Sequence, residues 1–140
     1  MTYILFSKSN QSVFQDICKY HYLVRTNSSS RSLLNEHKIF DPIRVKEYIL
    51  NINIDGMLQS AQKAYMNTCI NVYNSLVLDK SILLKKNKKE VWNLIYEHRK
   101  WIIFLSKKQK ILANFIIACP IGYKPIYRFY AKYLMQSRYE

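Results

Sequence analysis

The chain holds very few of the residues that turn a polypeptide sharply. Its 140 residues include only 2 glycines and 3 prolines. β-Sandwiches and β-barrels need many tight turns, which glycine and proline largely supply. With 49% hydrophobic residues, the chain is long and apolar enough to bury one core. We therefore expect a mainly α fold of four to five helices.

The clearest predicted helix runs from Met57 to Leu78. Its apolar and small residues recur at three- and four-residue steps, which is the period of an amphipathic helix. The repeating positions are Leu58, Ala61, Tyr65, Thr68, Val72 and Leu76. A second helix is expected to reach about Leu105, after residues 85–89, which form either a basic loop or its start. A third is expected over about 107–118.

Capping signals predict the ends of the other helices. Asp41 suits an N-cap and Pro42 the first helical position, so a helix should begin there. The segment Cys119–Gly122 should end the helix before it, because proline cannot continue the hydrogen-bond ladder. A last helix is expected from about 124 to 136, with Pro125 in its first turn.

The beginning of the chain has a different pattern. Tyr20 and Tyr22 alternate with other residues, which predicts a short strand with both rings on one face. The Asn-Ser-Ser-Ser run that follows favours a turn. Arg25 therefore stands between strand and loop, where an anionic or sugar-like ligand could bind. We expect a strand and serine-rich loop over residues 1–36 and a helical, basic region over residues 37–140.

The net charge of +13, from 22 basic and 9 acidic residues, implies an acidic partner. Lys124, Arg128 and Lys132 are spaced four apart and form a stripe on one helix face, with Tyr127 and Tyr130 on an adjacent face. Three interpretations stay open: a solvated basic face, docking on an anionic membrane surface, and binding of nucleic acid. The last has the weakest support, since no nucleic-acid-binding motif is present.

The sequence offers few catalytic or metal-binding patterns. The three cysteines are far apart, with no Cys-x-x-Cys pair, and the three histidines have no metal-ligand spacing. No Asp-x-Asp occurs, and two glycines cannot form a phosphate-binding glycine loop. No apolar run approaches the roughly 20 residues of a membrane span. We expect a cytoplasmic chain, peripheral at most at the inner face of a membrane.

Five residues in the first part of the chain form a spaced pattern. They are arranged as Tyr20-x-Tyr22-x-x-Arg25-x-x-Ser28-x-x-x-Ser32. This pattern resembles the Tyr-x-Tyr strand, arginine and serine-rich turn that follow the catalytic domain in bacterial family 2 glycosyltransferases, which make cell-surface polysaccharides. In that family a helical region, often basic and aromatic, comes next. The helices from Asp41 onward look like that region.

The resemblance implies that the chain is the acceptor-side and membrane-docking C-terminal part of an enzyme that transfers a sugar from a nucleotide-sugar donor. Arg25 would face the donor diphosphate or the acceptor, and Ser28 would shape the loop over the site. Tyr22 is a third candidate substrate contact, although packing is its simpler role.

Family members also have an N-terminal domain with an Asp-x-Asp metal motif and an acidic base, and this chain has neither. We therefore expect it to be inactive alone and to hold no cofactor. The divalent metal would belong to the missing catalytic domain or subunit. The expected partners of this chain are that domain or subunit and an anionic membrane surface. The alternative is a basic helical module that binds an anionic membrane or nucleic acid, with no link to sugars.

Overall fold

The computed structural model describes residues 34–52, 56–79 and 84–135. Within them the fold is mainly α, and no strand occurs in this part of the chain. Residues 36–140 form a unit of their own. Of the strand and loop predicted for residues 1–36, residues 1–33 lie outside the described residues, and Tyr22, Arg25 and Ser28 are among them.

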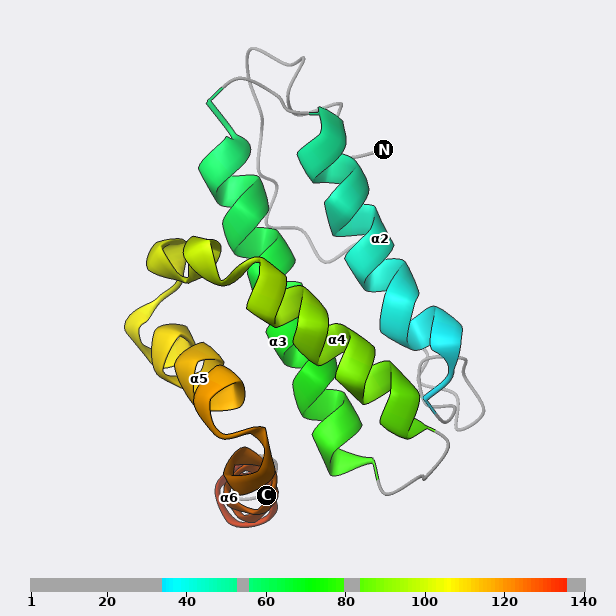
Figure 1. Cartoon of the computed structure of the whole chain (residues 1–140), viewed down its shortest axis with the longest axis vertical. Coiled ribbons are helices and arrows are strands. Elements are labelled where there is room, and N and C mark those ends of the chain that lie inside the picture. Colours follow the sequence, from blue (N-terminus) through cyan, green and yellow to red (C-terminus); the bar gives the residue numbers. More distant parts are fainter. Residues whose placement is uncertain (1–33, 53–55, 80–83, 136–140) are drawn as a thin grey trace, which may run out of the picture. The chain divides into compact units, whose positions relative to one another are not determined.

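The described elements follow one another closely. They are α2 (Glu36–Ile52), α3 (Leu58–Leu78), α4 (Lys85–Glu97), the 3-10 helix η3 (Arg99–Phe104), α5 (Lys107–Ala118), α6 (Pro120–Tyr130) and the π-helical turn η4 (Ala131–Met135). The central helix is α3, which contacts α2, α4, η3, α5 and α6 (Figure 1). The mainly helical fold expected from the scarcity of glycine and proline is confirmed.

The buried surface of α3 is wider than one stripe. Three of its predicted repeating residues, Ala61, Tyr65 and Leu76, are buried, and so is the neighbouring Cys69, whereas Leu58 is exposed at the start of the helix. A second set of side chains is buried beside them: Met66, Ile70, Tyr73, Asn74 and Val77. Helices pack on more than one side of α3, so more than one face of it leaves water.

The predicted start of the first described helix is wrong. α2 begins at Glu36, and Pro42 lies inside it. Ile39 and Ile43 are four residues apart and are both buried, which requires helix on both sides of Pro42. The Asp41 carboxylate does not cap the helix start and instead pairs with Arg44 at 3.3 Å. Burial of the two isoleucines therefore outweighs the cost of a proline within the helix.

The predicted start of the last helix is also wrong. Helix α5 ends at Ala118, as expected, but α6 begins at Pro120 instead of near residue 124. Cys119 alone separates the two helices, and Pro120 fits the first helical position, where no backbone N–H is needed. Gly122 lies within α6, and a Cβ there would stand 2.8 Å from Cys119 Sγ. This sharp joint fixes where α6 leaves α5.

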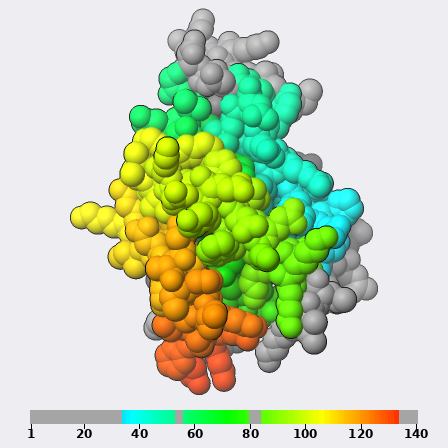
Figure 2. Space-filling view, in the orientation of Figure 1, coloured from blue at the N-terminus to red at the C-terminus, as the bar shows by residue number. Residues whose placement is uncertain are grey.

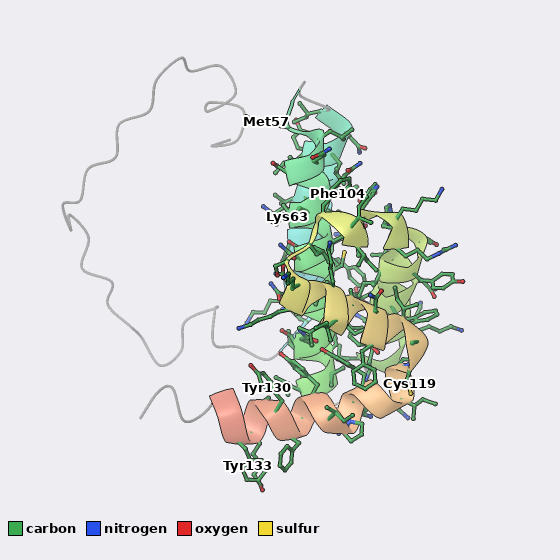
Figure 3. The ribbon with its side chains drawn as sticks, turned by 90° about the vertical axis from the view of Figure 1, so that its left-hand side faces the viewer. Met57, Lys63, Phe104, Cys119, Tyr130 and Tyr133 are labelled. Atoms are coloured by element: carbon green, nitrogen blue, oxygen red, sulfur yellow. The ribbon has the colours of Figure 1, made fainter. Side chains whose placement is uncertain are left out.

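A buried hydrogen bond attaches α6 to α3. The Tyr123 hydroxyl donates to Asn74 Oδ1 at 2.6 Å, and the Tyr123 side chain is only 1% exposed. Burial raises the pKa of Tyr123, so the hydroxyl stays protonated and keeps its role as donor. The contact holds α6 across the C-terminal part of α3 (Figure 3).

We predict that Tyr123→Phe lowers the free energy of unfolding by about 1–3 kcal/mol, because it leaves the buried Asn74 oxygen without its donor. Urea unfolding followed by circular dichroism measures this. Tyr133→Phe is the matched control, since Tyr133 is exposed and its hydroxyl removal should change stability by less than about 0.5 kcal/mol. Equal effects of the two changes would show that the buried bond contributes nothing.

Candidate functional site

Arg128 lies against α3. Its Nε donates to the Val77 carbonyl at 2.8 Å, and its Nη2 donates to the Asp79 carbonyl at 3.4 Å. These carbonyls stand at the C-terminal end of α3, where helical carbonyls lack partners in the helix and carry partial negative charge. The half-buried guanidinium therefore acts as a cap that joins α6 to α3.

The predicted stripe of cations on α6 has three different environments. Lys124 is half-buried in a pocket beside α4, Arg128 is bonded to α3, and Lys132 is exposed with its Nζ 5.2 Å from the centre of the Tyr133 ring. Residues four apart drift around a helix of 3.6 residues per turn. Such a drift is enough to divide the stripe between a pocket, a neighbouring helix and solvent.

The predicted aromatic positions also separate. Tyr127 is half-buried and stacks on Tyr123, with ring centroids 5.4 Å apart. Tyr130 is exposed. We call the α6 outer face the set of large exposed side chains spaced three and four residues apart along α6 and η4: Ile126, Phe129, Tyr130 and Tyr133. Each is between 44% and 64% exposed.

The members of the α6 outer face do not all point the same way. Figure 3 shows Tyr133 of η4 on the side turned away from the other helices and Tyr130 on the side that faces them, and Ile126 and Tyr130 also line the space between α5 and α6. Its ring lies 4.5 Å from that of Phe129, so the two form one exposed aromatic pair. Sequence reasoning placed only Tyr130 in this set as a candidate membrane residue. The others could be identified only once the side of α6 that packs on α3 was known.

An apolar groove adjoins the α6 outer face. It has a volume of about 470 Å3 and lies between α5 and α6. Its lining residues are Lys108, Ile111, Leu112, Phe115, Tyr123, Ile126, Tyr127 and Tyr130. Because Ile126 and Tyr130 belong to both surfaces, the groove extends the exposed apolar area onto α5, where Ile111 is also exposed.

A second cavity, of about 460 Å3, lies between α4 and α6 and is rich in cations. We call it the lysine pocket. Its lining residues are Tyr73, Lys85, Lys88, Lys89, Trp92, Pro120, Ile121 and Lys124, and no acidic residue is among them. In the space-filling view α4, α5 and α6 adjoin on one face (Figure 2).

The charges of the lysine pocket repel one another. Burial lowers the pKa of Lys88, and the nearby positive charges of Lys124, Arg128 and Lys85 lower it further. Because no acidic residue lines the pocket, its lining carries an excess of positive charge.

Two aromatic residues form fixed walls of the lysine pocket. Trp92 donates its Nε1–H to the Ile116 carbonyl at 3.0 Å and stacks on Tyr96, with ring centroids 5.3 Å apart. Tyr73 is only 3% exposed. These contacts hold both rings in place, so the pocket is shaped by the packing of α3, α4, α5 and α6.

Other chemical groups of the described residues offer less. Burial raises the pKa of the Cys69 thiol to about 12, so it stays protonated as a small apolar core residue. In residues 34–52, 56–79 and 84–135, no three His, Cys, Asp or Glu side chains converge as a metal site. None of the helices described has the length and apolar content needed to cross a bilayer.

Comparison of the chain with protein-family models, curated proteins and solved structures found no significant match. The resemblance to family 2 glycosyltransferases rests on residues 20–32, outside the described part of the chain. The roles assigned to Arg25, Ser28 and Tyr22 therefore stay predictions.

We predict that Arg128→Met lowers the free energy of unfolding by about 1.5 kcal/mol, because it removes a charged donor from the carbonyl end of α3. Lys132→Met is the matched control on the same helix and should change stability by less than about 0.5 kcal/mol, since Lys132 is exposed. Thermal and urea unfolding measure both. An Arg128→Met protein as stable as the control would rule out the capping role.

Proposed function

We propose that the chain binds peripherally to an anionic membrane surface, at its cytoplasmic face, through the α6 outer face and the groove beside it. The observation that carries the proposal is the row of large exposed side chains from Ile126 to Tyr133 along α6 and η4. Soluble surfaces rarely group such side chains unless they meet an apolar partner.

Charge favours a bilayer as that partner. Residues 98–135 contain eight lysines and arginines and no aspartate or glutamate. Lys107, Lys108 and Lys110 open α5, and Lys132 stands beside the α6 outer face. Each such cation contributes about 1 kcal/mol near an anionic leaflet. Apolar insertion and electrostatic attraction together supply the two signals that stable peripheral binding requires.

The chemistry of the exposed side chains also fits the lipid headgroup region. Tyr130 and Tyr133 join an apolar ring to a polar hydroxyl, and such residues settle at membrane–water interfaces. Phe129 and Ile126 are purely apolar and would insert slightly deeper. Nucleic acid would attract the same cations but would gain little from an exposed isoleucine, so it is the alternative that the test must separate.

The sugar-transfer role expected from the family resemblance is not needed for this proposal. That role depends on residues outside the described part of the chain. If the resemblance holds, membrane docking is the task that this C-terminal region would perform for its enzyme.

We predict that the full chain sediments with vesicles of phosphatidylcholine and phosphatidylglycerol, but much less with phosphatidylcholine alone. Phe129→Ser and Tyr133→Ser should each weaken binding about tenfold, because each removes roughly 1.5 kcal/mol of apolar burial. Added salt should weaken binding by screening the lysines.

Tyr48→Ser is the matched control for Tyr133→Ser. Tyr48 lies on α2 and is 61% exposed, against 55% for Tyr133. It should leave vesicle binding unchanged. The proposal fails if Tyr48→Ser and Tyr133→Ser weaken binding equally. It also fails if the chain binds a single-stranded oligonucleotide more tightly than the anionic vesicles and Phe129→Ser leaves that preference intact.

A further inference from the structure

We propose that the lysine pocket is a binding site for a phosphomonoester, whose phosphate group is held by Lys88 and Lys85 of α4 together with Lys124 of α6. The site shares no lining residue with the apolar groove. The inference therefore does not depend on membrane docking.

The cavity has the size and construction of a small-molecule site. Its volume of about 460 Å3 falls within the usual range for ligand pockets, roughly 300–1,000 Å3. Residues from α3, α4 and α6 build it, so its shape follows from the packing of the fold. Apolar walls with a few convergent polar groups are typical of such sites.

The charges indicate an anion. Four lysines line the cavity without an acidic residue, and Lys88 and Lys124 are half-buried. Burial lowers the pKa of Lys88, and repulsion from the neighbouring cations, Lys124 among them, lowers it further. A bound anion with two negative charges would offset this repulsion and stabilise the charged ammonium groups of the lysines.

The position of the lysines in α4 supports the same conclusion. Lys85, Lys86, Lys88 and Lys89 crowd its first turns, and no acidic residue stands in the first turn. The N-terminal end of a helix is positive, so cations there are unfavourable and acids are preferred. Residues that break a local stability rule are expected at functional sites.

The dianionic phosphate suits this geometry better than a carboxylate does. A phosphomonoester carries close to two negative charges at neutral pH and several acceptor oxygens, so ammonium groups from two helices can bind it at once. Trp92, Tyr73 and Ile121 offer an apolar wall for the group that carries the phosphate. The chemistry could come from a soluble metabolite or from a lipid with a phosphomonoester headgroup.

The test compares phenyl phosphate with phenyl sulfate by isothermal titration calorimetry on the full chain. The two probes share their ring and tetrahedral shape but differ in charge. We expect phenyl phosphate to bind at least about tenfold more tightly. Lys88→Met and Lys124→Met should each weaken its binding about tenfold, while preserving most of the alkyl packing.

Lys86→Met is the matched control, because Lys86 is exposed in the same turn of α4 and does not line the pocket. It should change the affinity by less than about threefold, the effect of one remote charge. The proposal is overturned if both probes bind equally, or if Lys86→Met weakens binding as much as Lys88→Met.

Melting temperature provides a second readout that does not depend on measurable heats. Lys88→Met should melt higher than the unmodified chain without probe, because a repelled and partly buried charge is gone. Phenyl phosphate should raise the melting temperature of the unmodified chain but not of Lys88→Met. The proposal is contradicted if Lys88→Met lowers the melting temperature and phenyl phosphate still raises the melting temperature of the variant as much as that of the unmodified chain.

Vesicles distinguish the two sources of the phosphate. Phosphatidic acid carries a phosphomonoester, whereas phosphatidylglycerol does not, so vesicles of equal surface charge isolate the headgroup. Lys88-dependent preference for phosphatidic acid supports a lipid, and Lys88-dependent binding of free phenyl phosphate supports a soluble molecule. If neither result is observed, the proposal is overturned. Phe129→Ser should leave phenyl phosphate binding unchanged, so failure of membrane docking and failure of this site can be told apart.

Discussion

The attachment of α6 to α3 determines every surface considered above. Tyr123 donates a buried hydrogen bond to Asn74, and Arg128 bonds the carbonyls at the end of α3. The two contacts stand on neighbouring turns of α6 and meet α3 at different points, so together they restrict both the position and the rotation of α6. They thereby help to decide which side chains of α6 face solvent.

Once that rotation is set, helical geometry gives α6 three distinct sides. One side packs on α3 through Tyr123 and Arg128. A second places Lys124 in the lysine pocket, and Phe129 and Tyr133 are exposed on the third. A helix that is apolar over most of its circumference would normally be buried, and α6 is not. The exposed aromatic pair is therefore the feature that a packing argument alone leaves unexplained.

The sequence predicted the helices better than their ends or their contacts. Periodicity located α3 almost to the residue, because that helix has a regular apolar face. The bounds predicted for α5 match the observed helix, and its end was predicted from the proline that follows it. The predicted starts of α2 and α6 were wrong, because Pro42 and Pro125 were each taken to mark the first turn of a helix. Both helices begin earlier, and each buries a large side chain before its proline, Ile39 in α2 and Tyr123 in α6. A helix extends beyond a local capping signal when the longer helix is stabilised by burial of a large side chain.

The candidate sites were predictable only in part. The excess of lysines near the end of the chain indicated an anionic partner, but the lysine pocket joins Lys88 to Lys124 across two helices. Likewise, the partner of Arg128 is a backbone carbonyl of a distant helix, which leaves no trace in the side-chain pattern. Contacts of this kind follow from the tertiary packing and not from spacing along the chain.

The stability of α4 explains how the fold tolerates its lysines. A cation in the first turn costs roughly 0.3–1 kcal/mol, and exposure to solvent keeps Lys85 at the low end of that range. On the core side of the same helix Val91 and Ile95 are completely buried, and each contributes about 1.5–3 kcal/mol. The burial of these two side chains thus outweighs the cost of the lysines and keeps α4 helical. Its other face can carry charges that local helix preferences would exclude, and those charges are the ones that line the pocket.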